Sequence, residues 1–336
     1  MSLAHTIQNA WNKQAKWLVL LRPLSCLYGC AFSLNKALYQ SGFKKTYHAP
    51  IPVMVIGNIT VGGSGKTPLL IQLVRYLQQH QVRVGVISRG YGGAGPFPKI
   101  VDLDTTAEEV GDEPALIVQR TQVPMAVGPN RQQSIELLLE KYSLDLILSD
   151  DGLQHWALGR QIEWVVLDKT RGLGNEKLLP EGYLREPKTR LQQVSVIEHT
   201  AHPDTAYSMM LKVADPYLLN KTHNTSLVFD PKQRFHAVVG IGYPQRFYRS
   251  LAEIGVVDVE HHAFADHYAY RIDDLIFDDD LPIITTEKDA VKIKAVLAQH
   301  PQIKNQIWVL PVEASLSDAC YTLLKQQLQQ FHIHID

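Results

Sequence analysis

The sequence predicts an α/β protein: a P-loop NTPase-like parallel sheet followed by a second, smaller α/β/α domain. Three observations support this prediction. From residue 51 onward, apolar runs typical of buried strands alternate with stretches of helical spacing. A glycine-rich stretch, GNITVGGSGKTP at 57–68, joins the first of these strands to the first helix. The chain has 336 residues, which is more than one domain of ordinary size requires.

The charge of the chain is unevenly distributed. The formal net charge is -1, yet none of the 34 acidic residues precedes Asp102, whereas residues 1–101 contain eleven Lys and Arg. The beginning of the chain should therefore attract anions, such as phosphates or an anionic membrane surface. The three cysteines are too few for a disulfide framework and form no CxxC pair, which favours a reducing cytoplasm.

Residues 1–48 are predicted to form an amphipathic helical segment. The stretch WNKQAKWLVLLRPLSCLYGCAFSLNKALYQ is apolar and basic, but Arg22-Pro23 and Asn35-Lys36 interrupt its apolar runs. Each run is then shorter than the ~20 residues needed to cross a bilayer, and a kink is expected at Pro23. Two alternatives remain. The segment lies in the plane of a membrane interface, which the charge distribution favours, or it packs on the protein's own core.

The rest of the chain divides into three parts. Residues 49–204 contain the strand runs IPVMVIGN, VRVGVISRG and LDLILSDD, and a helix that places Leu69, Leu73 and Leu77 on one face. Residues 205–231 contain two short runs that we expect to pair as a two-stranded linker. Residues 232–336 repeat the strand-helix rhythm and should form the smaller domain.

The stretch GNITVGGSGKTP has the chemistry of a phosphate-binding loop. Its glycines let backbone N–H groups turn towards an anion, its lysine adds a positive charge, and its threonine offers a hydroxyl to Mg²⁺. The general pattern G-x-x-x-x-G-K-[ST] has its first glycine where this chain has Thr60, but the flanking strand and helix are in place. The predicted ATP-binding residues are Thr60, Val61, Gly62, Gly63, Ser64, Gly65, Lys66 and Thr67.

A carboxylate that holds Mg²⁺ should lie at the end of a neighbouring strand. The stretch LDLILSDDGLQH supplies a strand run followed by Asp150 and Asp151, and either of them is a candidate ligand. The alternative is IEWVVLDKTRG, whose strand run ends at Asp168, although this residue can also simply terminate a strand.

Two further motifs offer groups for acid-base chemistry. Asp112 and Glu113 precede Pro114, where they either begin a helix as capping residues or supply the carboxylate that a kinase needs as a base. The spacing in HHAFADHYAY, at 261–270, does not indicate zinc. Beside a carboxylate, His267 is either a titrating functional group or a partly buried loop residue.

Arginine-containing motifs follow other predicted strands. They are SRGYGG with Arg89 and Tyr91, VGPNRQQS with Arg131, and LLPEGYLREP with Arg185 and Glu186. Arginines in such places are natural clamps for the phosphate groups of a substrate, and each could also belong to a surface loop.

Together the motifs resemble those of one known family. GNITVGGSGKTP, SRGYGG, VGDEP, GPNR, SDDGLQH, LLPEGYLREP, FADH and TTEKDAVK occur in the order found in the tetraacyldisaccharide 4'-kinases of lipid A biosynthesis. The resemblance runs from the N-terminal helix nearly to the C-terminus. It implies transfer of phosphate from ATP, with Mg²⁺, to the 4'-hydroxyl of a tetraacyl glucosamine disaccharide 1-phosphate. It also implies two α/β/α domains, joined by a two-stranded linker, that close around the nucleotide.

The resemblance further implies a place and partners for the protein. The enzyme would be peripheral to the cytoplasmic face of the bacterial inner membrane, where its lipid substrate and an anionic surface meet it. Neither nucleic acid nor an obligate protein partner is expected. The alternative function is a P-loop nucleotide switch or metallochaperone-type NTPase without a lipid acceptor, since GGxGKT also resembles that branch.

Roles for individual residues follow from the same resemblance. Asp112 would be the general base, supported by His267, and Lys66 would hold the phosphates. The metal would be held by Thr67, Asp150, Asp151 and Glu113. The substrate or the transferring phosphate would be held by Arg89, Tyr91, Arg131, His155, Arg185 and Glu186.

Overall fold

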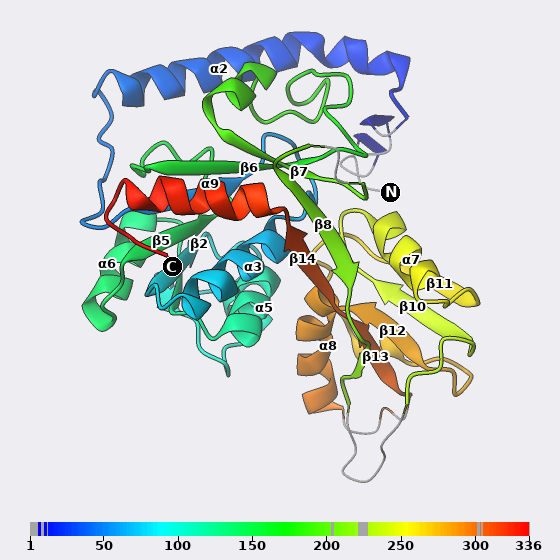
Figure 1. Ribbon diagram of the computed structural model, residues 1–336. Helices are drawn as coiled ribbons and strands as arrows, with labels where there is room; N and C mark the ends of the chain where they lie inside the picture. The colour runs from blue at the N-terminus through cyan, green and yellow to red at the C-terminus, as the bar shows by residue number, and fades with distance from the viewer. Residues whose placement is uncertain are drawn as a thin grey trace.

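The protein has a mixed α/β fold that contains two sheets (Figure 1). The computed structural model describes residues 6–7, 10–11, 13–202, 205–220, 228–300, 303 and 305–335. In Figure 1 the larger sheet and its helices lie beneath the long helix α2, and the smaller sheet lies at the lower right with α7 and α8. The predicted α/β class is confirmed.

The larger sheet is mostly parallel. Within the described residues it has nine strands in the order β14-β8-β7-β6-β1-β5-β2-β4-β3. The strands from β8 to β4 pair in parallel, and only the edge strands β14 and β3 pair antiparallel. The bounds are β1 Val53–Gly57, β2 Val84–Ser88, β3 Lys99–Ile100, β4 Met125–Val127, β5 Leu146–Asp150, β6 Ile162–Asp168, β7 Ser195–His199, β8 Ser208–Val213 and β14 Val312–Leu316.

Helices bury both faces of this sheet, as the alternating pattern predicts. Successive residues of β1 point to opposite faces. Met54 therefore packs with the leucines of α3 (Lys66–Gln79), and Val55 packs with α6 (Arg131–Lys141) on the other side. The predicted apolar face of α3, at 69, 73 and 77, is fully buried. The other helices of this part are α4 Ala107–Val110, α5 Asp112–Thr121, η2 Lys188–Gln193 and α9 Asp318–Gln329.

The smaller sheet has its own core. Its five strands within the described residues have the order β11-β10-β12-β13-β9, and only β9 pairs antiparallel. Phe235 and Trp308 pack with α7 inside it. The bounds are β9 Tyr217–Leu218, β10 Phe235–Val239, α7 Pro244–Glu253, β11 Val259–Ala263, η3 Ile272–Leu275, β12 Ile283–Thr286, α8 Glu287–Gln299 and β13 Ile307–Leu310.

The connection between the sheets uses two strands that are far apart in the sequence. β8 lies in the expected linker at 205–231, but its antiparallel partner is β14, which follows the last strand of the smaller sheet. α9 then returns to the larger sheet, where Leu324 and Leu328 enter the core and Trp164 donates a 2.8 Å hydrogen bond to Gln327. We therefore propose that the larger domain comprises residues 49–213 and 312–335, and the smaller domain residues 214–311.

The N-terminal segment forms one helical run. A 3₁₀ turn, η1 (Lys16–Leu21), leads into α2 (Arg22–Gln40), and together they make 25 residues that contain an 18-residue window with a mean hydropathy of 1.5. By length and composition this run is long and apolar enough to cross a membrane, so the prediction of two shorter runs is wrong. Pro23 lies in the first helical turn, where its missing N–H breaks no hydrogen bond, and Asn35-Lys36 lies within the helix.

Candidate active site

The glycine-rich stretch forms a phosphate loop between β1 and α3. Gly62 and Gly65 have φ of +103° and +98°, a left-handed conformation that glycine adopts without strain. Gly65 is the N-cap of α3, so Lys66 and Thr67 begin the helix, whose unpaired N–H groups attract anions. A Cβ placed on Gly63 would meet no described atom within 4 Å. The loop therefore has the open backbone that a bound phosphate requires.

The first two predicted ATP-binding residues anchor the loop to the protein. The amide of Thr60 donates to Asn58 Oδ1 at 3.0 Å, and that of Val61 donates to the Tyr183 carbonyl at 2.9 Å. Arg171 in turn donates to the Val61 carbonyl at 2.5 Å. At the other end of the loop, the Ser64 carbonyl lies 3.1 Å from His199 Nδ1. Thr60, where the general pattern has glycine, thus belongs to the support of the loop.

The lysine of the loop faces the carboxylates at the end of β5. Lys66 Nζ lies 3.4 Å from Asp151 Oδ1. Arg185 also binds both oxygens of Asp151, at 2.9 and 3.0 Å, and donates to the Asn58 carbonyl. Burial opposes ionisation of Asp151, but the charges of Lys66 and Arg185 outweigh it and hold its pKa well below the usual range.

Asp150 differs from its neighbour because no Lys or Arg in the described part of the chain forms an ion pair with it. Burial, followed by the nearby charges of Glu113 and Asp151, raises the pKa of Asp150 to about 7. Its Oδ1 is buried and has no hydrogen-bond partner among the described residues, while Oδ2 lies 3.5 Å from Ser88 Oγ. A buried carboxylate oxygen without a partner fits Mg²⁺, which prefers oxygen ligands. The residues present are therefore compatible with a magnesium ion.

Asp112 and His267 meet across the two domains. His267 Nδ1 lies 3.0 Å from both carboxylate oxygens of Asp112, although 155 residues separate them in the chain. Asp112 is the first residue of α5, and Gly111 is the N-cap. Besides its contact with His267, the Asp112 side chain accepts a hydrogen bond from the neighbouring Glu113 amide at 2.9 Å. The carboxylate therefore contacts the histidine and also accepts from an amide of the first helical turn, so both alternatives of the sequence analysis describe part of its environment.

Two lysines of α8 complete this cluster. Lys288 Nζ lies 3.1 Å from Glu113, 3.3 Å from Asp266 and 3.9 Å from Asp112. Lys292 Nζ lies 3.7 Å from Asp112. Neither lysine was predicted to belong to the site, although their spacing in TTEKDAVK places both on one face of a helix.

The two members of the pair shift each other's titration. The hydrogen bond with Asp112 raises the pKa of His267 above 6.5. Burial opposes ionisation of Asp112, but the hydrogen bond from His267 and the charges of Lys288 and Lys292 outweigh it, and its pKa lies below 3.8. Between pH 3.8 and 6.5 the pair therefore consists of a protonated His267 imidazolium and an ionised Asp112 carboxylate.

This ionisation predicts how stability depends on pH. Because the pKa of His267 is raised in the folded state, the histidine contributes its full stabilisation below pH 6.5. This contribution is lost as the pH rises through the pKa of the folded state. A lowered aspartate pKa stabilises the fold above pH 3.8. The difference in Tm between wild type and His267→Gln should thus be largest between pH 3.8 and 6.5, and it should become smaller above pH 6.5. Thermal melts over a pH series measure this, with the exposed His334→Gln as control. A gap that stays constant with pH would contradict it.

Among the predicted substrate residues, Arg89, Arg131 and His155 lie close enough for their charges to interact, and Asp150 is near Arg131. Arg131 is buried, donates to the Gly128 carbonyl at 2.7 Å, and has an Nε without a described partner. Burial and the neighbouring arginines lower the pKa of His155 to about 4, so its imidazole is neutral. The exposed ring of Tyr91 packs edge-on against His267, with centroids 5.2 Å apart. Arg89 is also exposed, and its charge acts on Arg131 and His155.

Glu186 and Arg185, the other predicted substrate residues, are bound to protein side chains. Glu186 is buried and accepts a 2.6 Å hydrogen bond from Gln154, with Arg190 at 3.3 Å. Arg185 is bound to Asp151, as described above. Both residues therefore help to hold the site together, whatever contact they make with a substrate.

Asp168, the alternative metal ligand, has a different environment. Its carboxylate pairs with Arg246 of α7 and caps the following turn, accepting from the Thr170 amide at 3.0 Å. Arg246 also reaches the Gly63 carbonyl at 3.5 Å. Asp168 therefore links the smaller domain to the phosphate loop. Arg246 and His267, from the part with the smaller sheet, thus contact the phosphate loop and Asp112 in the part with the larger sheet.

Known proteins are similar in sequence to this chain over nearly its full length. The family model described as tetraacyldisaccharide-1-P 4'-kinase (LpxK) matches residues 17–329. The tetraacyldisaccharide 4'-kinase of Psychrobacter cryohalolentis is 47% identical over 100% of this chain and 99% of its own length. That of Pseudomonas syringae pv. tomato is 44% identical over 98% of both chains.

A solved structure agrees with the sequence relatives. The crystal structure of the "apo" form of LpxK from Aquifex aeolicus in complex with ATP superimposes with a TM-score of 0.74. It is 26% identical and covers 94% of this chain and 99% of that one. Fold, loop geometry and relatives lead to the same conclusion: this chain belongs to the tetraacyldisaccharide-1-P 4'-kinase family.

Proposed function

We propose that the protein transfers the γ-phosphate of ATP to the 4'-hydroxyl of a tetraacyl disaccharide 1-phosphate, the reaction for which its relatives are named. The observation that carries this proposal is the Asp112–His267 pair beside a phosphate loop. A nucleotide switch needs no carboxylate base for a second substrate, whereas a kinase needs one to accept the proton of the attacking hydroxyl. The alternative of an NTPase without a lipid acceptor is therefore not favoured.

The donor side consists of the loop and the carboxylates of β5. The backbone of residues 62–67 would surround the β- and γ-phosphates of ATP, and Lys66 would leave Asp151 to pair with them. Arg185 would keep Asp151 paired when the lysine moves. The residues that would hold Mg²⁺ are Thr67 and Asp150, which has the free oxygen, together with Asp151 and Glu113. When bound, the ion neutralises the negative charge of the phosphates.

The acceptor side consists of the base and the predicted substrate residues. Asp112 would take the proton of the 4'-hydroxyl, and His267, in contact with both oxygens, would hold the carboxylate in place. Because phosphoryl transfer depends mainly on position and charge, the nearby arginines suit the phosphates involved. We assign Arg89 and Arg131 to this role, with Tyr91 and His155 beside the sugar.

A transfer assay tests the function directly. The protein is incubated with ATP labelled on the γ-phosphate, Mg²⁺ and the disaccharide lipid in detergent. We expect label in the lipid, with little free phosphate when the lipid is omitted. Steady release of phosphate without transfer would support the nucleotide-switch alternative and overturn the kinase assignment.

The helix α2 carries the features expected of a membrane-binding surface. One side is tied to the loop at 178–185: Arg22 pairs with Glu181 at 2.9 Å, Ser25 donates to the Leu178 carbonyl, and Tyr28 donates to that of Arg185. The other side is an exposed apolar stripe at helical spacing. It begins in η1 with Leu20, which is 76% exposed, and continues along α2 with Leu24, Leu27 and Leu34.

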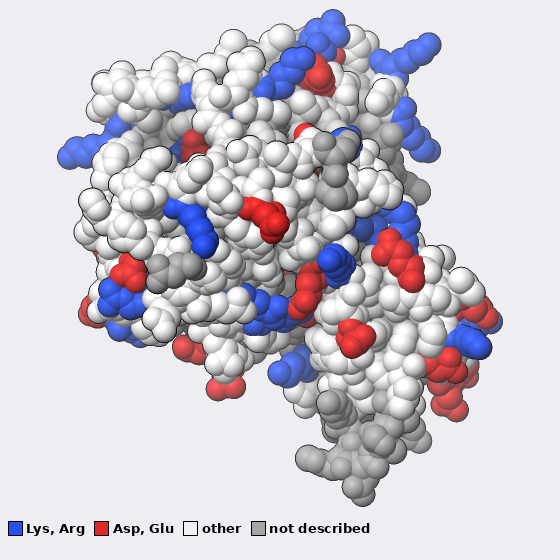
Figure 2. Space-filling view, viewed as in Figure 1, with Lys and Arg blue, Asp and Glu red and all other residues white. Residues whose placement is uncertain are grey.

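These contacts favour a helix that lies on the membrane over one that crosses it. Crossing would require α2 to leave the domain along its whole length and to expose Arg22, Ser25 and Tyr28 to lipid. Figures 1 and 2 show α2 along the upper edge of the molecule, with Lys and Arg side chains spread over that edge. We therefore propose a peripheral enzyme whose α2 stripe enters the cytoplasmic leaflet of the inner membrane, near its lipid substrate.

Charged residues in the stripe should weaken membrane binding. Full burial of a leucine side chain contributes about 1.5–3 kcal/mol. The double variant Leu24→Asp/Leu27→Asp should therefore lower vesicle affinity by at least ~100-fold. Sedimentation with phosphatidylglycerol/phosphatidylethanolamine vesicles measures this. Leu103→Asp is the matched control, because Leu103 has the same exposure as Leu24, 53%, but lies outside the helix. Unchanged binding of the double variant would remove α2 from the membrane contact.

A further inference from the structure

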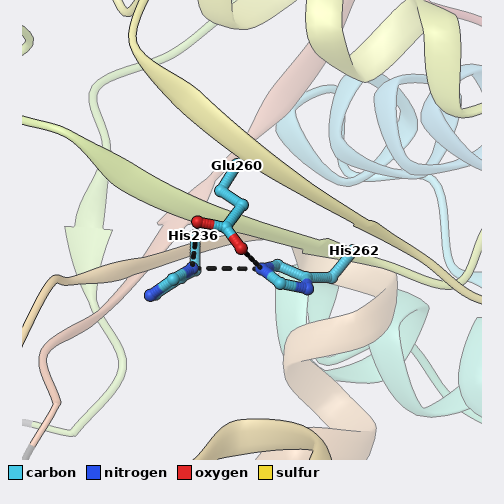
Figure 3. A group of neighbouring side chains, drawn as sticks. All are labelled: His236, Glu260 and His262. Carbon is cyan, nitrogen blue, oxygen red and sulfur yellow. Dashed lines mark hydrogen bonds and ion pairs between the residues drawn. The ribbon is translucent and has the colours of Figure 1, made fainter. Parts of the chain in front are cut away.

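Two neighbouring strands of the smaller sheet bring three possible metal ligands to one place. In the parallel pair β10–β11, His236 lies opposite Glu260, and Val238 lies opposite His262. Because side chains alternate along a strand, Glu260 and His262, two residues apart, point to the same face as His236. Figure 3 shows the three side chains converging on a common point. The spacing within the histidine motif alone could not reveal this, since one ligand comes from another strand.

The separations suit a small transition-metal ion. His236 Nδ1 lies 3.0 Å from His262 Nε2. Oε2 of Glu260 lies 3.9 Å from His236 Nδ1, and Oε1 of the same carboxylate lies 3.8 Å from His262 Nε2. Ligand atoms around a tetrahedral zinc ion, with bonds of about 2.0–2.1 Å, are roughly 3.3 Å apart. The observed values lie on both sides of this spacing, so small side-chain movements would complete the coordination.

The support of His236 is typical of a metal ligand. This histidine is only 2% exposed, and its Nε2 lies 2.9 Å from the carboxylate of Asp279. With its proton on Nε2, the imidazole donates to Asp279 and directs the lone pair of Nδ1 at the common point. Asp279 is itself held by the Leu281 amide, which donates to it at 3.2 Å. A histidine oriented by a carboxylate is a recurrent feature of zinc sites.

An aromatic ring fixes both histidines from one side. Phe277 is stacked on His236, with centroids 3.7 Å apart and an interplanar angle of 16°. Its centroid is also 4.7 Å from that of His262. The ring limits rotation of the two imidazoles and excludes water from that side of the site, so less ordering is needed when an ion binds.

The remaining neighbour of the cluster is compatible with an ion. Arg234 pairs with Oε2 of Glu260 at 3.2 Å. The carboxylate has a second oxygen, Oε1, which faces His262 and remains available for coordination. The donor set of two imidazoles and one carboxylate favours zinc and related transition metals over Mg²⁺, which prefers oxygen ligands.

We propose that His236, Glu260 and His262 form a binding site for a divalent transition-metal ion of the zinc type, with the fourth position open to water. The ion would tie the edge strand β11 to β10. β11 leads directly into the loop that carries Asp266 and His267. The site would therefore stabilise the part of the smaller domain that presents the histidine partner of Asp112, without touching the phosphates itself.

Zinc binding by the full-length protein tests this proposal. Chelator-treated protein is titrated with ZnCl₂ by calorimetry, and Tm is measured with and without the metal. We expect wild type to take up one equivalent more than His262→Gln, with a higher Tm when zinc is present, and MgCl₂ to produce neither effect at this site. His261→Gln is the matched control, since this exposed histidine lies on the opposite face of the same strand. It should retain the wild-type stoichiometry.

A second variant separates a metal site from a simple hydrogen-bonded histidine pair. Asp279→Asn, which alters only the orientation of His236, should weaken zinc affinity about 10–100-fold. Equal zinc uptake by wild type and His262→Gln would overturn the proposal, and so would wild-type protein that binds no zinc. Because these readouts do not involve phosphate transfer, failure here leaves the kinase assignment unaffected.

Discussion

Asp112→Asn is expected to lower kcat for transfer of phosphate to the lipid by about 10²–10⁴-fold, the usual contribution of a general base. Asparagine keeps the shape of the side chain and can still accept the 2.9 Å hydrogen bond from the Glu113 amide. It cannot accept the proton of the 4'-hydroxyl, and it removes the negative charge opposite His267 and Lys292. Initial rates of labelled-phosphate transfer at saturating ATP measure the effect.

Two controls separate loss of the base from loss of the fold. Asp104→Asn removes an exposed carboxylate elsewhere and should keep the wild-type rate. The affinity of Asp112→Asn for ATP, measured by calorimetry, should remain close to wild type because the phosphate loop is unchanged. If Asp112→Asn transferred phosphate at nearly the wild-type rate, the base would have to be another residue.

Lys66→Met should also be severely impaired, with kcat lower by about 10²–10³-fold, as for other groups that stabilise charge in the transition state. Methionine retains most of the apolar length of the side chain, so packing changes little. The carboxylate of Asp151 stays paired with Arg185 at 2.9 Å, so the substitution leaves no buried charge alone. The loss should therefore appear in catalysis and leave thermal stability nearly unchanged.

The comparison for Lys66 is a lysine outside the site. Lys141→Met, at the exposed end of α6, should have wild-type kcat and KM. Measuring both constants for Lys66→Met distinguishes its roles: a fall in kcat indicates transition-state stabilisation, and a rise in KM alone indicates binding of ATP in the ground state. A variant with normal kcat would exclude Lys66 from the chemistry.

Much of the donor half of the site could be predicted from local sequence. The phosphate loop is contiguous, and its glycines, lysine and threonine have fixed positions relative to the strand and helix that flank it. The apolar face of α3 follows from helical periodicity in the same way. Asp150 and Asp151 follow from their place at the end of a strand run, and only the structure shows that Asp150 Oδ1 has no hydrogen-bond partner among the described residues.

The acceptor half depends on contacts between distant parts of the chain. The pairing of Asp112 with His267 was expected only from the family resemblance, because no local pattern relates residues 155 positions apart. Lys288 and Lys292 join the same cluster through α8 and were not predicted. The break expected at Arg22-Pro23 was wrong because a proline in the first turn is compatible with a helix.

The sequence by itself determined the phosphate loop, the alternation of strands and helices, and the family, because each depends on residues close together in the chain or on the order of motifs. Only the tertiary structure decided which strand pairs with β8, where α9 packs, and which side chains share a site. The histidines of β10 and β11 show why: their register comes from pairing of two strands, and that pairing depends on burial of the whole sheet.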